Sequence, residues 1–579
     1  MATAQGKLLF NRLGVFAGGW TLDAAETICS DEHLSSADIL DVLGRLVDKS
    51  LVVKIPSEND MTRYRLLETL RHYALERLIS TGEIEDLRRR HATFYLELAE
   101  RAHPLLRGQN QVKWLRRLED EHDNLRAAFE WWKTDRLEMA LRFAGALGRF
   151  WHMRGYWTEG RIRLSPLLDT PDATEPTEVR AKALVASGHL AFLQRDFSEA
   201  KRRYEEALSI RRNLGDASKI ADSLHRVGIL AEVRQEYDVA WRLQTESLSI
   251  GRGHAGANLL ADILHHLAGL EDIRGNAELA KALKQESLDL RQTTGDRWGE
   301  AWSLIVQGNE RRYHGDYVAA KDLYERGLNI YEATGDKRRI TYLVNKLGMI
   351  YLDSGDLRAA EDAFGRGLNH ARQLGIQEEI AEACANLGRV AHARGSLQAA
   401  RVQLEESIAL LTAGAPENHE KNYDLSNAWP GYYDVGSRIE VLADAIHSLG
   451  LVSLDQRDSY GAHQLFRESF DLLRSSEKAS PDRSRDHAQY LDGSSFVAAV
   501  CGDHGRALQL AGAADAIRER LGATLPPGIQ HSNRLRLSTS WQALGAVAQN
   551  EWLIGRAMSS VDAIALAESI TAHQNPGSN

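Results

Sequence analysis

Histidine and acidic clusters are the first places where this sequence could support chemistry. The chain has 21 histidines, but His265 and His266 are adjacent in a predicted helix, where neighbouring side chains do not face each other. The acidic run at 119–123 could hold a cation, although a solvated or ion-paired helix face is the interpretation we favour. No H-E-x-x-H, G-x-S-x-G or cysteine–histidine spacing occurs in the sequence. We therefore predict no catalytic residue and no metal site, and a protein that is not an enzyme.

A phosphate-binding loop is also missing from the sequence. No G-x-x-x-x-G-K-[ST] pattern occurs, and Lys7 in the segment 5–8 (QGKL) is not followed by Ser or Thr. Without such a loop there are no clustered backbone amides for phosphates and no hydroxyl for Mg²⁺. We therefore predict no nucleotide and no other cofactor.

The overall composition limits the possible partners. The chain has 71 Lys and Arg against 81 Asp and Glu, a net charge of −10, which disfavours broad contact with nucleic acid or anionic lipid. Cys29, Cys384 and Cys501 form no disulfide framework. No apolar run approaches the roughly 20 residues of a membrane span, and the first residues lack a signal-peptide pattern. We predict a cytoplasmic protein with no membrane partner.

A regular repeat dominates the middle of the chain. Small residues recur in three columns, each with a 40-residue step, and the second and third columns start at Ala200 and Ala207. The first column contains Gly188, Gly228, Ala268, Gly308, Gly348 and Gly388. Gly-containing turns such as SGDL at 354–357 separate the first and second columns and permit a positive φ. Each repeat is therefore predicted to be an antiparallel helix pair that must stack on its neighbours.

The spacing of small residues resembles the tetratricopeptide repeat, whose usual step is about 34 residues. The longer step implies longer helices. After Ala400 the step breaks, and Gly450 and Ala462 resume the pattern after about 22 extra residues. The extra segment is predicted to be either a surface loop or a lid that brings Trp429, Tyr432 and Tyr433 over a groove.

The N-terminal segment is predicted to be a winged helix. Three short helices are expected first: one over 8–16, one that begins at Thr21 and one that begins at Ser35. Two strands (SLVVKI and RYRLL) follow, and then a fourth helix that ends at Gly82. DNA binding through the third helix is an alternative function, but its ionisable residues sum to −1, whereas a helix in the major groove usually needs Lys or Arg. A packing or signalling role is the favoured interpretation.

Five segments together resemble one family. They are LFNRLGVFAGGWTLDAAE, VLGRLVDKSLVV, RYRLLETLRHYALERL, RRRHATFYLELAE and EDEHDNLRAAFEW. Their order is similar to that in the bacterial STAND-type predicted ATPases and LuxR-type transcriptional regulators. The resemblance implies a winged helix that reports the state of a nucleotide-binding module and a repeat array that senses an inducer or partner. The phosphate-binding loop is missing from this sequence, so the chain is expected either to be a portion of such a regulator or to meet an NTPase module as a partner in trans.

The expected fold is therefore all-α, with a tetratricopeptide superhelix of 40-residue helical hairpins after a small winged-helix domain. The predicted domains are 1–90 for the winged helix, 91–165 for connecting helices and a first degenerate repeat, 166–412 for tetratricopeptide repeats, 413–436 for an inserted loop, and 437–575 for C-terminal tetratricopeptide-like helices.

The first helix of each pair is expected to line the concave groove of the superhelix. Fixed offsets from the first column predict eleven groove residues: His225, Glu232, Asp262, His265, Asp272, Trp302, Asn309, Arg312, Tyr342, Asn345 and Arg389. Their mixture of charged, amide and aromatic groups suits an extended peptide or a partner helix. We predict a non-catalytic regulatory protein that binds a protein or peptide in this groove, with a small inducer as an alternative ligand and nucleic acid as an unlikely partner.

Overall fold

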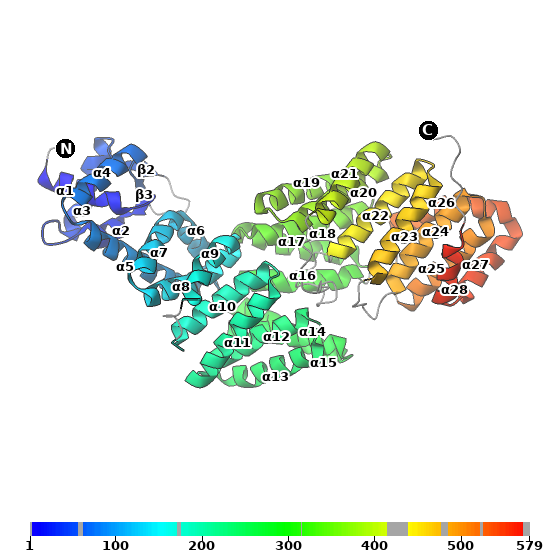
Figure 1. Ribbon diagram of the computed structural model, residues 1–579, viewed down its shortest axis with the longest axis horizontal. Helices are drawn as coiled ribbons and strands as arrows, with labels where there is room; N and C mark the ends of the chain where they lie inside the picture. Colours follow the sequence, from blue (N-terminus) through cyan, green and yellow to red (C-terminus); the bar gives the residue numbers. More distant parts are fainter. Residues whose placement is uncertain are drawn as a thin grey trace. The chain divides into compact units, whose positions relative to one another are not determined.

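The computed structural model describes residues 3–55, 62–170, 175–313, 315–413, 438–475, 484–521 and 525–570. The chain divides into two compact units, which we describe separately. The first unit contains Met1–Ala231, Tyr237–Glu300 and Ala333–Gly335, and the second contains Glu232–Glu236, Ala301–Glu332 and Asp336–Asn579. Helices make up nearly all of the described secondary structure (Figure 1), so the predicted all-α class is confirmed.

The first unit begins with the predicted winged helix. Its elements are α1 (Ala4–Arg12), η1 (Leu13–Val15), β1 (Trp20–Thr21), α2 (Leu22–Cys29), α3 (Ser36–Asp48), β2 (Val53–Ile55), β3 (Arg63–Arg65) and α4 (Glu68–Ser80). The three strands form an antiparallel sheet in the order β1-β3-β2. The sequence predicted only β2 and β3, because a strand of two residues is too short to show an alternating pattern.

Local interactions explain where these helices begin. Thr21 caps α2 as predicted, since its hydroxyl oxygen accepts a hydrogen bond from the Ala24 amide at 3.3 Å. Ser35 precedes α3, but its hydroxyl donates to Asp38 Oδ2 at 2.8 Å instead of accepting from the backbone. Leu67 lies just before α4 and is 47% exposed, whereas Ala74 and Leu78 of this helix are buried.

Helices of the first unit continue from the winged helix into the hairpin repeats. The connecting helices are α5 (Ile84–Leu105), α6 (Gln111–Asp120), α7 (His122–Asp135), α8 (Leu137–Arg154) and α9 (Trp157–Leu168). Helix α5 runs across the boundary predicted between residues 90 and 91. One apolar core extends from the winged helix through these helices to α10 and α11 of the first regular hairpin.

The regular hairpins recur at the predicted step. They are α10 (Glu178–Leu193) with α11 (Phe197–Leu214), α12 (Ala217–Val233) with α13 (Tyr237–His254), α14 (Ala257–Ile273) with α15 (Ala277–Thr294), α16 (Arg297–Tyr313) with α17 (Tyr317–Thr334), α18 (Lys337–Asp353) with α19 (Leu357–Leu374), and α20 (Gln377–Ala393) with α21 (Leu397–Thr412). In the first unit, α13, α14 and α15 pack side by side (Figure 1). The division between the units falls within α16.

The C-terminal helices of the second unit include two further hairpins. The helices are α22 (Arg438–Asp455) with α23 (Ser459–Ser475), α24 (Ser484–Val500) with α25 (His504–Arg520), and then α26 (Pro527–Leu544), η3 (Gly545–Val547), α27 (Ala548–Ala557) and α28 (Ser560–Glu568). The predicted insertion at 413–436, including the aromatic lid, lies outside the described residues except for Ala413.

At five positions of the first small column, a side chain of the second helix occupies the space where a Cβ atom would lie: an aromatic ring at Gly188, Gly308 and Gly348, Gln244 at Gly228 and Leu404 at Gly388. A Cβ atom at Gly188 would lie 2.9 Å from the Tyr204 ring, and one at Gly348 would lie 2.6 Å from the Phe364 ring. Both rings come from the second helix of the same hairpin as the glycine. Such distances are below van der Waals contact, so only glycine lets the two helices pack this closely.

Replacing Gly348 by alanine is therefore expected to destabilise the second unit by about 1–3 kcal/mol, because Phe364 is fully buried and cannot move away. Thermal unfolding measures the effect. The matched control is Gly365→Ala in α19, where no atom lies within 4 Å of the added Cβ. This control should be neutral or stabilising by up to about 1 kcal/mol. Equal effects of the two substitutions would contradict this packing explanation.

The turn inside each hairpin contains one residue with a positive φ. Glycine occupies this position at Gly275, Gly315, Gly355, Gly395 and Gly502, but three other hairpins have Arg195, Gln235 and Arg457 there, with φ of 64°, 59° and 68°. The left-handed conformation costs about 1–2 kcal/mol for a residue with a Cβ atom. These three turns are therefore strained relative to the glycine turns.

Changing Arg457, which is exposed, to glycine is expected to raise the stability of the second unit by about 1 kcal/mol. The shift in the thermal unfolding midpoint measures this gain. Arg457→Ala removes the same charge but keeps the strain, and should give no gain. If both variants had the same stability, backbone strain would not be the cause.

Candidate partner-binding surface

Four predicted groove residues lie on first helices of hairpins in the first unit. His225 is on α12, and Asp262, His265 and Asp272 are on α14. The two histidines are buried, whereas the two aspartates are partly exposed. Asp272 forms an ion pair with Lys284 of α15 at 2.7 Å. The aspartates are therefore the members of this set that solvent can reach.

The buried histidines form a packed cluster. His225 Nδ1 lies 2.9 Å from Gln244 Oε1 on α13, and its ring centre is 5.1 Å from that of His266. The ring centres of His265 and His266 are 5.7 Å apart. Burial lowers the pKa of His225 to about 3 and holds the pKa of His265 well below its ordinary value. Both rings are therefore neutral at pH 7 and serve as packed polar groups.

Asp262 is held by two arginines. Arg107 Nη2 lies 2.6 Å from Asp262 Oδ2, and Arg291 Nη2 lies 3.1 Å from Asp262 Oδ1. Burial alone would raise the pKa of Asp262, but the two guanidinium groups lower it below its ordinary value. Arg107 comes from the non-helical segment 106–110, which joins α5 to α6, and no pattern in the sequence predicts it at this position.

The second unit contains the other set of predicted residues. Asn309 Nδ2 donates a hydrogen bond to the Tyr342 hydroxyl at 3.1 Å, and the Tyr324 hydroxyl donates to Asn309 Oδ1 at 2.5 Å. Trp302 is buried, and the Arg339 guanidinium carbon lies 4.0 Å from the centre of its ring. The structure thus brings Asn309 and Tyr342 into direct contact, and Tyr342 stays partly exposed.

The remaining predicted residues differ in accessibility. Arg389 is partly exposed and its Nη1 donates to Asn386 Oδ1 at 3.4 Å. Arg312 is also partly exposed, whereas Glu232 and Asn345 are buried. The eleven residues therefore do not gather at one point: they fall into two sets in two units, and the accessible polar groups of the second set are Arg312, Tyr342 and Arg389.

Helix α26 adds an unpredicted contact to the second unit. Its Arg536 forms two hydrogen bonds with Asp455 at the end of α22, at 2.6 and 2.8 Å. His392 at the end of α20 lies 2.7 Å from the same carboxylate. Helix α26 does not follow the regular step of the repeats, so register offsets could not identify Arg536 as a neighbour of these helix ends.

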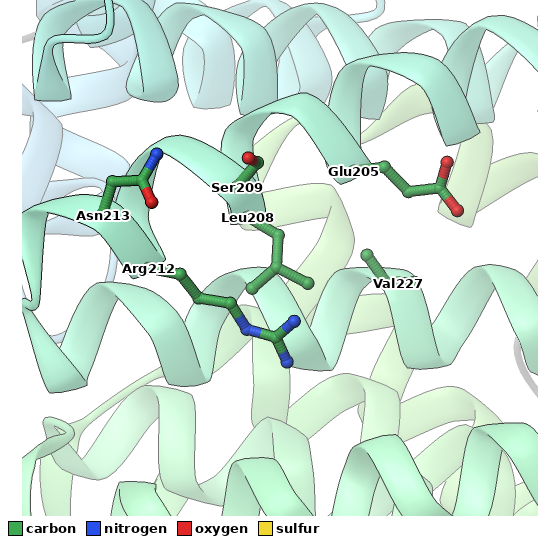
Figure 2. Close-up of a pocket in the computed structure, with 6 residues that line it drawn as sticks. All are labelled: Glu205, Leu208, Ser209, Arg212, Asn213 and Val227. Atoms are coloured by element: carbon green, nitrogen blue, oxygen red, sulfur yellow. The ribbon is translucent and has the colours of Figure 1, made fainter.

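A cleft of about 400 Å³ lies between α11 and α12 of the first unit (Figure 2). Its lining mixes charged, polar and apolar side chains. They are Glu205, Leu208, Ser209, Arg212, Asn213 and Val227. None belongs to the predicted groove set, because the offsets used for that prediction select positions on the first helices and most of this cleft is formed by a second helix.

A buried polar network joins the wing to the connecting helices. Arg63 of β3 forms an ion pair with Glu121 and donates to the carbonyl oxygens of Gly19 and Asp120 at 2.9 and 2.7 Å. The same carboxylate accepts hydrogen bonds from Tyr95 at 2.9 Å and Asn124 at 2.8 Å. This network fixes the winged helix on α5 and α7.

The acidic run at 119–123 is ion-paired, as favoured from the sequence. Glu121 pairs with Arg63, and Glu119 Oε2 lies 3.2 Å from Arg154 Nε. Across the residues that the structure describes, no three His, Cys, Asp or Glu side chains are grouped in a way that could hold a metal ion. Within the same residues, no helix is long and apolar enough to cross a membrane.

The exposed face of α3 is poor in positive charge. Asp38, Asp41 and Asp48 are exposed there, and Arg45 is the basic residue among them. Leu40 on this helix is 51% exposed. Phosphate groups would meet a net negative surface, which does not favour insertion of this helix into a DNA groove.

Comparison with family models identifies two segments of the chain. Residues 3–79 match a winged helix-turn-helix domain, and residues 259–333 match a tetratricopeptide repeat. The chain therefore combines a winged helix-turn-helix domain with tetratricopeptide repeats.

Two curated relatives come from Mycobacterium tuberculosis. One, whose name describes an HTH-type transcriptional regulator, is 34% identical over 236 residues, which cover 39% of this chain and 26% of the relative. An uncharacterized protein is 40% identical over 80 residues, 14% of this chain and 20% of that protein. The chain thus matches about a quarter or less of the length of these relatives.

Two solved structures share similarity at low sequence identity. A Signal Transduction ATPase with Numerous Domains (STAND) protein with a tetratricopeptide repeat sensor, from Pyrococcus horikoshii, is 13% identical with a TM-score of 0.39, over 96% of this chain and 66% of that chain. A Rap protein complexed with Competence and Sporulation Factor is 13% identical with a TM-score of 0.44, over 66% of this chain and 99% of that chain.

Proposed function

We propose that this chain is a non-catalytic regulatory protein whose tetratricopeptide repeats bind a protein or peptide partner, and that it is a portion of a STAND-type transcriptional regulator in the cytoplasm. The name of the relative that is 34% identical supports a role in transcriptional regulation. The observation that carries the binding proposal is the pairing of Tyr342 with Asn309 in the second unit, at 3.1 Å.

This pairing suits recognition of a polypeptide. The buried Asn309 amide, itself held by the Tyr324 hydroxyl, orients the Tyr342 side chain. Tyr342 is partly exposed, and a tyrosine hydroxyl can donate to or accept from a peptide. Arg312 and Arg389 add guanidinium groups, which suit carboxylates through paired hydrogen bonds. Tyrosine and arginine are also the residue types that most often dominate protein interfaces.

A peptide library screened against the full chain tests this proposal, with affinities then measured by calorimetry. Tyr342→Ala and Arg389→Ala are expected to weaken a captured peptide by on the order of tenfold or more each. The matched control is Arg358→Ala, since Arg358 is exposed on α19, the second helix of its hairpin. If all three variants bound every captured peptide as tightly as the unchanged chain does, this surface would not be the binding site.

A small-molecule inducer is the second candidate ligand, and the cleft between α11 and α12 supports it. A metabolite panel tested by thermal shift addresses this candidate. A ligand of the cleft should lose its effect in Arg212→Ala and keep it in Tyr342→Ala. The opposite result would place the ligand in the second unit.

DNA binding and ATP hydrolysis are tested separately. A gel shift at low salt with random-sequence duplex DNA should show no complex, because α3 exposes mostly acidic side chains. Purified chain should not hydrolyse ATP, since the phosphate-binding loop is missing from its sequence. Partner binding by this chain is expected to depend on nucleotide only when an NTPase module of the STAND type is added in trans. Measurable hydrolysis by the pure chain would overturn the non-catalytic part of the proposal.

A further inference from the structure

Segment 541–560 of the second unit exposes a surface without charge. Eleven of its residues are exposed, and all eleven are uncharged. Its two charged residues, Glu551 and Arg556, are partly exposed and contact α25: Glu551 Oε2 accepts a hydrogen bond from Gln509 Nε2 at 2.5 Å, and Arg556 forms an ion pair with Glu519. Charged residues make up 26% of the whole chain, so this surface differs from the chain as a whole.

The exposed residues in and just before α27 form one apolar face. Val547, Leu553 and Ile554 are 52%, 50% and 40% exposed. Asn550 and Ala557 are exposed beside them. Because these positions follow each other at intervals of three or four residues, they lie on the same side of the helix. We call these five residues the uncharged face.

The opposite side of α27 packs closely on α25. Ala548 and Gly555 are buried on that side, and a Cβ atom at Gly555 would lie 1.8 Å from the Gln509 carbonyl oxygen. Only glycine permits such a close approach of two backbones. Helix α27 is therefore held with its uncharged face directed away from α25.

A face of this kind is typical of the core of a protein interface. Interface cores are depleted of charged residues, whereas the outer faces of repeat arrays are normally polar and keep the array soluble. Removing exposed apolar groups from water is also favourable. We therefore expect another protein surface to cover the uncharged face.

A second copy of this chain fits the face by charge. Two copies of a charged patch would place like charges opposite each other, which is unfavourable, and the uncharged face carries no such penalty. A different protein is usually selected by complementary charge, which this face does not offer.

A two-fold arrangement also suits the individual side chains. When two α27 helices pack antiparallel with the axis between Leu553 and Ile554, Leu553 of each copy meets Ile554 of the other. Asn550 of each copy then lies opposite Ala557 of the other, since both positions are equally far from the axis. The small alanine leaves room for the amide, and a single amide in an apolar seam fixes the register of a helix pair.

We propose that α27 is a dimerisation helix whose uncharged face pairs with the same face of a second copy across a two-fold axis. The proposal is independent of peptide binding, since Tyr342 and Arg389 lie on α18 and α20. A helix of ten residues is about 15 Å long, which is short for the roughly 800 Å² per partner of a standard interface. The dimer is therefore expected to be weak, with a dissociation constant on the order of 10 μM.

Sedimentation equilibrium of the full chain tests the dimer. Between about 1 and 200 μM, the average mass should rise from 64.6 kDa towards twice that value. Ile554→Glu should weaken the dimer by at least about tenfold, because it places two carboxylates beside the axis. The matched control is Val318→Glu on α17, which should dimerise like the unchanged chain, since Val318 is 84% exposed and lies outside the uncharged face. A chain that stays monomeric throughout, or a dimer that Ile554→Glu leaves unchanged, would overturn the proposal.

Opposite charges test the two-fold arrangement. Ile554→Lys should also be monomeric by itself, whereas an equimolar mixture with Ile554→Glu should form a mixed dimer at low salt. Assembly restored in the mixture requires that the uncharged face meets itself. A mixture that stays monomeric while the unchanged chain dimerises would overturn the two-fold pairing.

Asn550→Asp gives a second test if Ile554→Glu fails to fold. It changes an exposed side chain with almost no change in shape, and it places a carboxylate opposite Ala557 in the seam. The dimer should weaken by at least about tenfold. A folded Asn550→Asp chain that dimerises as tightly as the unchanged chain would overturn the pairing. Capture of a peptide by Tyr342 and Arg389 in a chain that stays monomeric would refute the dimer alone and leave the proposed function intact.

Discussion

Replacing Arg63 by alanine is expected to lower the stability of the first unit by about 3–5 kcal/mol. The Arg63 and Glu121 side chains are 9% and 3% exposed and form an ion pair. Without Arg63, the buried carboxylate keeps only neutral donors, Tyr95 and Asn124. Leaving one charge of a buried pair without its counter-charge is costly because neither water nor another cation replaces it. Chemical denaturation followed by tryptophan fluorescence measures the loss.

Two further variants separate charge burial from other causes. Arg65→Ala removes an exposed arginine from the same strand and should change stability by less than about 0.5 kcal/mol. The double variant Arg63→Met with Glu121→Leu removes both charges and should recover much of the loss. If Arg63→Ala were as mild as Arg65→Ala, the network would not anchor the wing on the connecting helices.

The repeat architecture was predictable because each hairpin encodes its packing within a single repeat. Gly348 and Phe364 belong to the same hairpin, and the steric need for glycine is visible as a recurring column. The third column carries a further regularity that the sequence did not explain. Ser247 and Ser287 each donate a hydrogen bond to a carbonyl oxygen 26 residues earlier, at 2.8 and 2.7 Å. A small residue was expected at these positions, but the role of its hydroxyl was not.

The candidate surface was less predictable, for two physical reasons. Register offsets place a residue on a helix, but they do not decide whether the side chain meets solvent or the neighbouring helix: His225 meets Gln244 and is buried. Contacts made by non-helical segments do not recur at a fixed spacing in the sequence, so a repeat pattern cannot locate them. Arg107 and Asp262 are 155 residues apart, and nothing in the sequence of segment 106–110 marks Arg107 as the partner of that aspartate.

Acidification from pH 7 to pH 5 is expected to destabilise the first unit by several kcal/mol through its buried histidines. Burial lowers the pKa of His91 to about 4 and those of His189 and His225 to about 3, from an ordinary value of 6.5. At pH values between 6.5 and these lowered pKa values, the histidines of the unfolded chain bind protons that those of the folded chain do not bind. Stability therefore falls as the pH drops below 6.5, by about 1.4 kcal/mol per pH unit for each histidine. At pH 5 each contributes about 2 kcal/mol of destabilisation.

Carboxylates do not obscure this effect in the same pH range. The arginines that contact Asp222 and Asp262 hold their pKa values below the ordinary value, so both groups stay charged in the folded chain from pH 7 to pH 5. Denaturant unfolding at several pH values measures the slope, and His225→Asn should reduce it by about 1.4 kcal/mol per pH unit below pH 6.5. His254→Asn, which changes an exposed histidine at the end of α13, should leave the slope unchanged. A slope in His225→Asn equal to that of the unchanged chain would show that the His225 ring takes up its proton in the folded state as readily as in the unfolded state.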